Sequence, residues 1–247
     1  MALHSDNHNH KLSDPIEKYN LLSELEEQFK SELNMPVCLG AELEFYLFNI
    51  ENIADLESKI NHQLKAEKGN NQYEIDLSPS QNLAEYAKLI EQTRQNIIDA
   101  AKSLGGSADF SSKPFAADYG NSMHIHLNFI GHENIEKYAQ ILCHYLPDTL
   151  EYFLPKTEDY SRLDKRFMAP THICYGGNNR TVAIRIPDSQ PRRLEHRLAA
   201  ASAEPSLVIY SILNSIDNGL KNPKSIKPAA KIHGNAWDAQ YGLVEIY

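Results

Sequence analysis

The sequence predicts an α+β fold in which helices cover one side of a sheet. The first observation is a strict alternation of apolar and polar residues, which is typical of half-buried strands. It occurs in residues 40–48, 72–77 and 123–129. The second observation is a helical spacing of apolar residues. It occurs in residues 21–33, 83–104 and 205–219. Strands that are apolar on one face need only one layer of helices, which leaves the polar face free.

The elements follow one another in a simple order. Residues 14–35 are predicted to form an N-terminal helix that ends before Pro36. In the long helix 83–104, Leu89 and Ile90 are expected to face inward, and Gly105 ends the helix. The remaining predictions are a helical segment in 49–68, helices in 133–153, strands at 181–186 and 193–198, and a helix at 205–219 that begins at Pro205.

We divide the chain of 247 residues into three parts. Residues 1–13 mix histidines with Ser, Asp and Asn and are predicted to be a disordered tail. Residues 14–35 form the N-terminal helix, and residues 36–247 form one folded domain. A single core is compatible with this length.

Composition excludes several classes of function. The formal net charge of −9 argues against a nucleic-acid binder, which needs a basic face. No apolar run reaches membrane-spanning length, so we expect no contact with a membrane. Cys38, Cys143 and Cys174 are odd in number and far apart, which predicts reduced thiols rather than disulfides. We therefore expect a cytoplasmic, soluble protein.

The segment 40–48 carries two acids on its polar face. Glu42 and Glu44 are two residues apart on one predicted strand, and no basic residue lies nearby in the sequence. Two carboxylates on one face repel each other, so this face is either open to water or binds a cation. An ordinary exposed strand remains the alternative at this point.

Other predicted strands repeat this pattern. If strands that follow one another in the chain are neighbours in the sheet, their polar faces form one concave surface. Its acids and imidazole are Glu42, Glu44, Glu74, Glu195 and His124, and its arginines are Arg180, Arg185, Arg193 and Arg197. Each residue alone has an ordinary alternative, such as half of a surface ion pair, but recurrence on several strands favours a site.

The residue types indicate a chemistry for this surface. Carboxylates with a single imidazole suit Mg²⁺ or Mn²⁺ better than zinc, which prefers more nitrogen or sulfur. Arginines beside such a cation are what phosphoryl transfer needs, because negative charge is spread over several oxygens. The sequence has no G-x-x-x-x-G-K motif, so any nucleotide would be bound without a P-loop.

Several of these segments resemble, in order, motifs of the glutamine synthetase family. They are GAELEF (40–45), EKGNNQYEI (67–75), KPF (113–115), GNSMHIH (120–126), APT (169–171), NR (179–180), IRIP (184–187) and RLEHR (193–197). The resemblance covers about residues 36–245. It implies a curved, mainly antiparallel sheet with helices on its convex side, a fold class shared with guanidino kinases.

The resemblance also implies a role for each matching residue. Two or three Mg²⁺ or Mn²⁺ ions would be bound by Glu44, Glu67 and Glu74 on the acceptor side and by Glu42, His124 and Glu195 on the nucleotide phosphates. Glutamate would be bound by Gly120, Arg162 and Arg197. ATP, as co-substrate, would be bound by His126, Asn128, Arg185 and Arg193. The catalytic residues would be Arg162, Arg180 and Arg185, and Arg193 would help to steady the transferring phosphoryl group.

The chain departs from the family pattern at several places. Family members have an N-terminal β-grasp domain, whereas we expect a tail and one helix before the first strand here, and a shortened C-terminal helical region. The stretch between Glu44 and Glu67 is shorter than usual, and Tyr119 replaces a small polar residue. Met168 stands where glutamine synthetases have a glutamate that handles the ammonium proton, and a thioether cannot take a proton. This favours the branch that γ-glutamylates polyamines and other amines.

The resemblance implies a ligase that uses ATP and a divalent metal. ATP would phosphorylate the side-chain carboxylate of glutamate, and ammonia or an amine would attack the acyl phosphate. The alternative is a related pseudoenzyme that binds nucleotide and metal and acts as a regulatory or binding protein. A guanidino kinase fits the motifs poorly. We expect small-molecule partners only, and an oligomer smaller than the family dodecamer because the β-grasp domain is missing.

Overall fold

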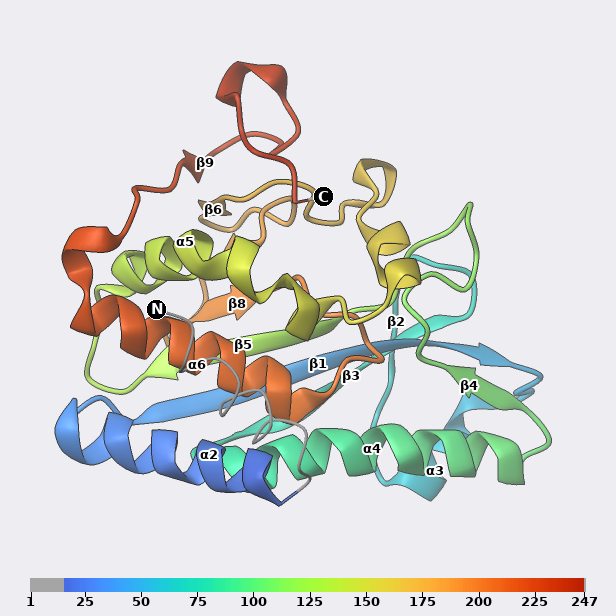
Figure 1. The fold of residues 1–247 in the computed structure, drawn as a ribbon. Helices are drawn as coiled ribbons and strands as arrows, with labels where there is room; N and C mark the ends of the chain where they lie inside the picture. The colour runs from blue at the N-terminus through green and yellow to red at the C-terminus, as the bar shows by residue number, and fades with distance from the viewer. Residues whose placement is uncertain (1–15, 247) are drawn as a thin grey trace.

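The computed structural model describes residues 16–246 and shows one mixed sheet with helices packed along one side (Figure 1). The predicted disordered tail, 1–13, lies outside the described residues. The sheet has the strand order β2-β3-β1-β5-β8-β7-β6-β9, and β4 pairs with β1. All pairings are antiparallel except those of β6 with β7 and β9. The predicted α+β class with a mainly antiparallel sheet is confirmed.

The strands vary greatly in length, and the three longest form the centre of the site-bearing region. They are β1 (Val37–Phe48), β2 (Lys65–Ala66), β3 (Gln72–Ser80), β4 (Ser107–Asp109), β5 (Met123–Phe129), β6 (Tyr175–Gly176), β7 (Ile184–Arg185), β8 (Leu194–His196) and β9 (Lys231–Ile232). The long strands β1, β3 and β5 are those that the alternating pattern predicts. Their apolar faces belong to the main hydrophobic core.

The helices that cover the core face are four long ones and a short one. They are α2 (Glu17–Glu27), α3 (Ile53–Ile60), α4 (Leu83–Ser103), α5 (Ile135–Phe153) and α6 (Pro205–Lys221). The helix α2 continues as a π-helical turn from Gln28 to Glu32. Short 3₁₀ turns lie at Thr157–Arg162, Lys165–Phe167, Pro223–Ser225 and Ala239–Tyr241. Figure 1 shows the helices along one face of the sheet. The burial of β1 alternates along the strand, so its less buried side chains lie on the opposite face.

Local signals explain where the helices begin and end. The side chain of Asn82 caps α4 by accepting a hydrogen bond from the backbone N–H of Glu85 at 3.1 Å. Gly105 follows α4 with a φ of +83°, a conformation that glycine adopts without strain. Pro205 occupies the first turn of α6, as predicted, where its missing N–H costs no hydrogen bond.

Three local predictions need correction. The strand predicted at 181–186 is limited to Ile184–Arg185, because the backbone N–H of Thr181 donates to the side chain of Asn179 in a turn. The strand predicted at 193–198 is limited to Leu194–His196. Leu89 is 39% exposed rather than inward-facing, because the stripe of α4 through Ile90 already fills the contact with the core.

Within residues 16–246, no helix combines the length and the apolar character needed to cross a bilayer.

Candidate functional site

Strand register brings the predicted acids and one histidine together on one face. In the antiparallel pair of β1 and β5, Glu42 lies opposite His124. In the pair of β1 and β3, Glu42 lies opposite Asp76, and Glu44 lies opposite Glu74. Directly opposed residues in a sheet point to the same side. The long central strands therefore place four carboxylates and an imidazole next to one another.

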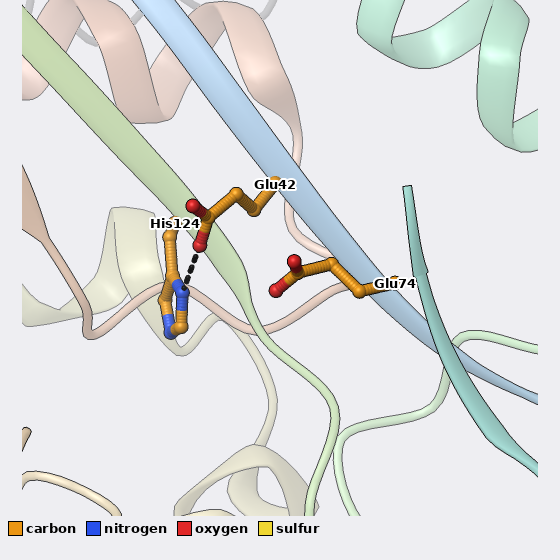
Figure 2. A group of neighbouring side chains, drawn as sticks. All are labelled: Glu42, Glu74 and His124. Carbon is orange, nitrogen blue, oxygen red and sulfur yellow. Dashed lines mark hydrogen bonds and ion pairs between the residues drawn. The ribbon is translucent and has the colours of Figure 1, made fainter. Parts of the chain in front are cut away.

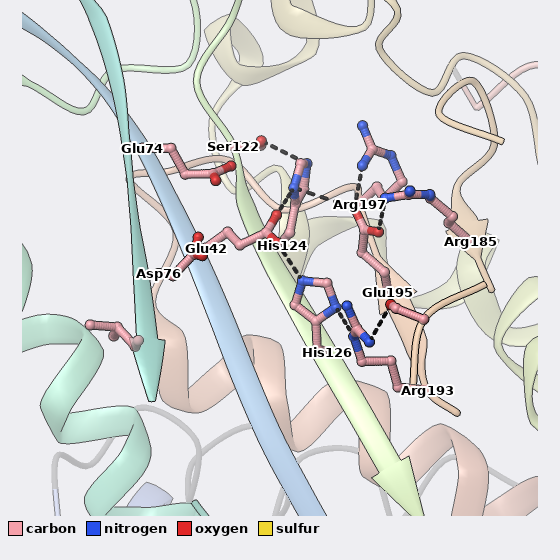
Figure 3. A network of polar contacts seen from close by, with 12 residues as sticks. Glu42, Glu74, Asp76, Ser122, His124, His126, Arg185, Arg193, Glu195 and Arg197 are labelled. Carbon is pink, nitrogen blue, oxygen red and sulfur yellow. Dashed lines mark hydrogen bonds and ion pairs between the residues drawn. The ribbon is translucent and has the colours of Figure 1, made fainter. Parts of the chain in front are cut away.

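The same face continues across the shorter strands. His126 of β5 lies opposite Glu195 of β8, and Glu195 lies opposite Arg185 of β7. The polar stripe therefore runs over β3, β1, β5, β8 and β7, with acids at the β3 end and arginines at the β7 end (Figure 3). The structure thus brings the polar side chains of the predicted surface into a continuous row, and the concave shape of that surface stays a prediction.

Two groups of side chains have the spacing of metal ligands. Glu42, Glu74 and His124 each offer a ligand atom within 4.8 Å of the others (Figure 2). Glu42, His126 and Glu195 form a second such group. Glu42 belongs to both groups, because one of its oxygens lies 3.0 Å from His124 Nδ1 and the other 3.0 Å from His126 Nε2. Two cations bound here would share the Glu42 carboxylate.

The structure gathers the two predicted ligand sets to different degrees. In the predicted set for the nucleotide phosphates, His124 Nδ1 lies 3.0 Å from Glu42 and 3.5 Å from Glu195. The structure therefore gathers this set and also brings in His126. In the set for the acceptor side, Glu74 groups with Glu42 rather than with Glu44 or Glu67. The ligand sets themselves stay predictions.

Ser122 holds the fourth carboxylate of the cluster. The carboxylate of Glu44 accepts hydrogen bonds from the backbone N–H of Ser122 at 2.8 Å and from its hydroxyl at 2.5 Å. The same hydroxyl lies 2.8 Å from His124 Nε2 (Figure 3). Sequence reasoning missed Ser122 as a site residue, although it lies in the GNSMHIH motif. Its contacts join the Glu44 side of the cluster to the His124 side.

At the acidic end of the stripe, the carboxylates repel one another and the neighbouring cationic side chains do not offset this repulsion. Burial, and then the carboxylates of Glu42, Glu44 and Glu67, raise the pKa of Glu74 to about 9. Burial and then Glu44 also raise the pKa of Glu67. A divalent cation removes this repulsion, because it neutralises two carboxylates at once. The donor set of the two groups, three carboxylates with two imidazoles, fits Mg²⁺ or Mn²⁺.

The other end of the stripe is balanced by cations of the protein itself. Burial opposes ionisation of Glu195, which is 0% exposed, but Arg197, His124, His126 and Arg185 lower its pKa to about 2. Burial likewise opposes ionisation of Glu42, and hydrogen bonds from His124 and His126 outweigh it, so the pKa of Glu42 lies below its usual range.

Two arginines form ion pairs with Glu195 and still have N–H groups without a hydrogen-bond partner among the described residues. Arg185 Nη1 donates to Glu195 Oε2 at 2.6 Å, and Arg197 Nη1 donates to Glu195 Oε1 (Figure 3). The buried Nε atoms of Arg185 and Arg197 have no hydrogen-bond partner among residues 16–246. Arg193 Nε lies 3.2 Å from His126 Nδ1. Unpaired buried N–H groups are costly, so an anionic oxygen is a favourable partner for them.

A cavity of about 400 Å³ lies beside the His126 end of the stripe. Three of the predicted nucleotide-binding residues line it, namely His126, Asn128 and Arg193. Its walls include apolar side chains such as Leu77 and Pro191. An apolar wall with a few polar groups is typical of a small-molecule pocket.

A second cavity, of about 490 Å³, contains Arg180 and Arg185. Arg185, the fourth predicted nucleotide-binding residue, therefore lies apart from the first cavity. Met168 lines the second cavity and has a φ of +60°, which is unusual for a residue with a side chain. Met168 and both arginines thus share one space.

Two of the residues predicted to bind glutamate, Gly120 and Arg162, pack against each other, and Arg162 also donates hydrogen bonds to backbone carbonyls. The guanidinium of the buried Arg162 donates to the carbonyls of Asn121 at 3.1 Å, Leu198 at 2.8 Å and Arg197 at 3.4 Å. A Cβ on Gly120 would lie 2.8 Å from Arg162 Cβ, so only glycine fits here. Substrate binding by Arg162 stays a prediction, and it would require some of these contacts to open.

The fold and the face together define an α+β domain with candidate metal-ligand groups beside arginines. A model of the family described as "Glutamine synthetase, catalytic domain" matches residues 50–242. The chain belongs to this family, which confirms the resemblance.

Individual relatives agree with this assignment. The chain is 27% identical to the Gamma-glutamylputrescine synthetase PuuA of Escherichia coli (strain K12), over 92% of this chain and 60% of that protein. It is 27% identical to a glutamine synthetase of Azotobacter vinelandii, over 82% of this chain and 46% of that protein. The chain thus spans about half the length of these relatives. The solved Plasmodium falciparum glutamine synthetase has the same fold, with a TM-score of 0.72 at 19% identity over 85% of this chain and 56% of that chain.

Proposed function

We propose that this chain is the catalytic part of a ligase that uses ATP to join glutamate to an amine through a γ-glutamyl phosphate. The observation that carries the proposal is the polar stripe. It combines two overlapping metal-ligand groups that share Glu42 with arginines whose buried Nε atoms are unpaired. Membership of the glutamine synthetase family supports the same reaction class.

We assign metal binding to the acidic end and the centre of the stripe. Glu44, Glu67 and Glu74 hold a cation on the acceptor side, and Glu42, His124 and Glu195 hold a cation on the nucleotide phosphates. Bound Mg²⁺ or Mn²⁺, two or three ions in all, supplies positive charge that offsets the phosphate oxygens. Ser122 keeps Glu44 and His124 oriented, since its hydroxyl contacts both side chains.

ATP occupies the cavity of about 400 Å³. Its apolar walls suit the base, and Arg193 and His126 at the stripe side suit the phosphates. Asn128 is held in place because its side-chain N–H donates to the backbone carbonyl of Arg192 at 2.7 Å. This arrangement directs the terminal phosphate toward the cluster around Glu42.

The transferring phosphoryl group lies toward the second cavity. Arg180 and Arg185 line that cavity, and their guanidinium groups offset the charge of the equatorial oxygens during transfer. Glutamate lies between Gly120 and Arg197, with its side-chain carboxylate facing the phosphate. The protein therefore brings two anions together, the side-chain carboxylate of glutamate and the terminal phosphate of ATP. Its arginines supply the positive charge that offsets the repulsion between them.

The acceptor is an amine rather than ammonia alone. Met168 lines the cavity of Arg180 and Arg185 and offers neither charge nor a proton acceptor. Its apolar side chain suits the carbon chain of an amine. The relative in Escherichia coli is named for γ-glutamylputrescine, which supports an amine acceptor here.

ADP release tests the proposal. The purified chain is incubated with ATP, Mg²⁺ or Mn²⁺, and glutamate, across ammonium, putrescine, longer polyamines and simple monoamines. We expect ADP release that requires both glutamate and one class of amine. The proposal is contradicted if ADP release does not depend on glutamate, or if no ADP is released with any of the amines.

A second candidate is a protein that binds nucleotide and metal without turnover and acts as a regulator. The observation that favours it is Arg162, in which each of the three guanidinium nitrogens donates to a backbone carbonyl. Saturable, metal-dependent ATP binding without ADP release would support this candidate. A cytoplasmic location and an assembly smaller than a dodecamer stay predictions under either function.

A further inference from the structure

The proposed reaction requires a group that handles a proton on the amine. An aliphatic amine resembles a lysine side chain, with a pKa of about 10.4, so at neutral pH it arrives as a cation. A protonated nitrogen has no electron pair with which to attack an acyl phosphate. The protein must therefore attract this cation and take up one of its protons.

The cavity of Met168 contains such a group. Its described lining combines two arginines, three asparagines, a threonine, a glycine and the thioether of Met168 with the side chains of His233 and Asp238. The arginines repel a cation, and the amides and the thioether do not take up protons. Among the described residues that line this cavity, Asp238 supplies the one carboxylate, the type of group that attracts a cation and accepts a proton, and His233 supplies an imidazole.

Asp238 is free to do this. Its carboxylate has no hydrogen-bond or ion-pair partner within residues 16–246, although Arg180 and Arg185 line the same cavity. Asp238 precedes the 3₁₀ turn Ala239–Tyr241, but its side chain does not cap that turn. A carboxylate without a structural partner, in a cavity that two arginines also line, is available for a ligand.

The chain positions Asp238 from its C-terminal segment. β9 pairs in parallel with β6, which brings residues 233–241 to the arginine end of the sheet (Figure 1). The side-chain N–H of Asn179 donates to the carbonyl of Gly234 at 2.7 Å, and Thr181 Oγ1 accepts from the backbone N–H of Ala236 at 3.0 Å. These bonds attach the segment of Asp238 directly to the segment of Arg180.

We infer that Asp238 is the residue that binds the ammonium group of the acceptor amine and removes its proton. This rests on the proposed function. The ammonium nitrogen gives one proton to the Asp238 carboxylate, and the free amine attacks the acyl carbon of γ-glutamyl phosphate. The C–O bond to phosphate breaks, phosphate leaves with the electron pair, and the second nitrogen proton leaves with it as hydrogen phosphate. The substrate class is therefore a cationic alkylamine.

The variant Asp238→Asn tests this inference. It keeps the side-chain volume and breaks no hydrogen bond, so we expect the fold to be intact, with an unchanged melting temperature. At pH 7, kcat/KM for the alkylamine should fall by about 100-fold or more, the usual contribution of a positioned base. KM for ATP and glutamate should stay unchanged. The residual rate should rise about tenfold per pH unit as the fraction of free amine increases.

Hydroxylamine provides the internal control, because it is largely unprotonated at neutral pH. We expect Asp238→Asn to form γ-glutamyl hydroxamate at close to the wild-type rate while its alkylamine turnover falls. Equal loss with both nucleophiles would show a structural effect and overturn the inference. An unchanged alkylamine rate in Asp238→Asn, or the loss appearing in His233→Gln instead, would overturn it as well.

The matched control is Glu245→Gln, which removes a carboxylate of the C-terminal segment that lines a different cavity. It should leave alkylamine kinetics unchanged. If wild-type protein forms neither hydroxamate nor amide, the proposed function fails. If it forms both and the variant does not separate them, the assignment of Asp238 alone fails.

Discussion

Neutralising Glu74 should make the metal-free protein more stable and the metal-loaded protein less stable. Glu74 is 8% exposed, and burial together with three other carboxylates raises its pKa from 4.5 to about 9. As the pH rises above 4.5, the unfolded chain releases this proton while the folded protein keeps it. Stability is therefore lost progressively between pH 4.5 and pH 9.

The size of this loss of stability at pH 7 follows from the distance between pH 7 and the unfolded-state pKa of 4.5. At about 1.36 kcal/mol per pH unit, the 2.5 units between 4.5 and pH 7 correspond to at most about 3.4 kcal/mol. The variant Glu74→Gln removes this loss of stability. For a chain of this length, 1 kcal/mol shifts the melting temperature by about 2–4 °C, so a rise of up to about 7–14 °C is expected in a chelating buffer.

Metal reverses the order of stability. A cation present at 100 times its dissociation constant stabilises the folded wild type by about 2.7 kcal/mol. Glu74→Gln removes a charged ligand atom from the group of Glu42 and His124, so its response to Mn²⁺ should be largely lost.

Differential scanning calorimetry at pH 7, with chelator and with a Mn²⁺ series, measures both effects. Glu51→Gln, which removes an exposed carboxylate, is the matched control and should behave as wild type. The reasoning is refuted if Glu74→Gln leaves both the metal-free melting temperature and the response to Mn²⁺ unchanged.

Three further predictions concern the neighbouring residues. Gly120→Ala should lower the free energy of unfolding in urea by about 1–3 kcal/mol, because the new Cβ would lie 2.7 Å from the backbone oxygen of Ser112. The control is Gly177→Ala, which should have no effect because no atom lies within 4 Å of its new Cβ. Arg162→Met should cost about 3 kcal/mol or more without any ligand, since it leaves buried carbonyls unpaired; unchanged stability would mean that those contacts are not structural. Arg193→Met should weaken Mg²⁺–ADP binding by about 10- to 100-fold in titration calorimetry, and equal affinity would remove Arg193 from the nucleotide site.

The face of each long strand could be predicted from the sequence. In β1, alternation assigns Leu43 to the core and Glu42 to the opposite face, and the structure places them so. The same reasoning identified His124 and Glu195 as members of a polar face. This works because the side-chain direction of a strand depends on backbone geometry alone and not on its partner.

Short strands could not be predicted in the same way. The alternation in 181–186 continues beyond the two residues that pair, because Asn179 and Thr181 form a turn that competes with the ladder. The predicted inward orientation of Leu89 is wrong for a related reason. Helical spacing places neighbouring apolar residues on adjacent faces of α4, and only packing decides which of these faces is buried.

The sequence by itself determined which residue types line one face of the sheet, and with them the candidate chemistry of carboxylates, imidazoles and arginines. Only the tertiary structure decided how they are combined. Register makes Glu42 common to two ligand groups, Arg162 is tied to the backbone, and β9 brings Asp238 into the cavity of Arg180. The physical reason is that these contacts join segments far apart in the chain, and local propensity contains no information about which distant strands pair.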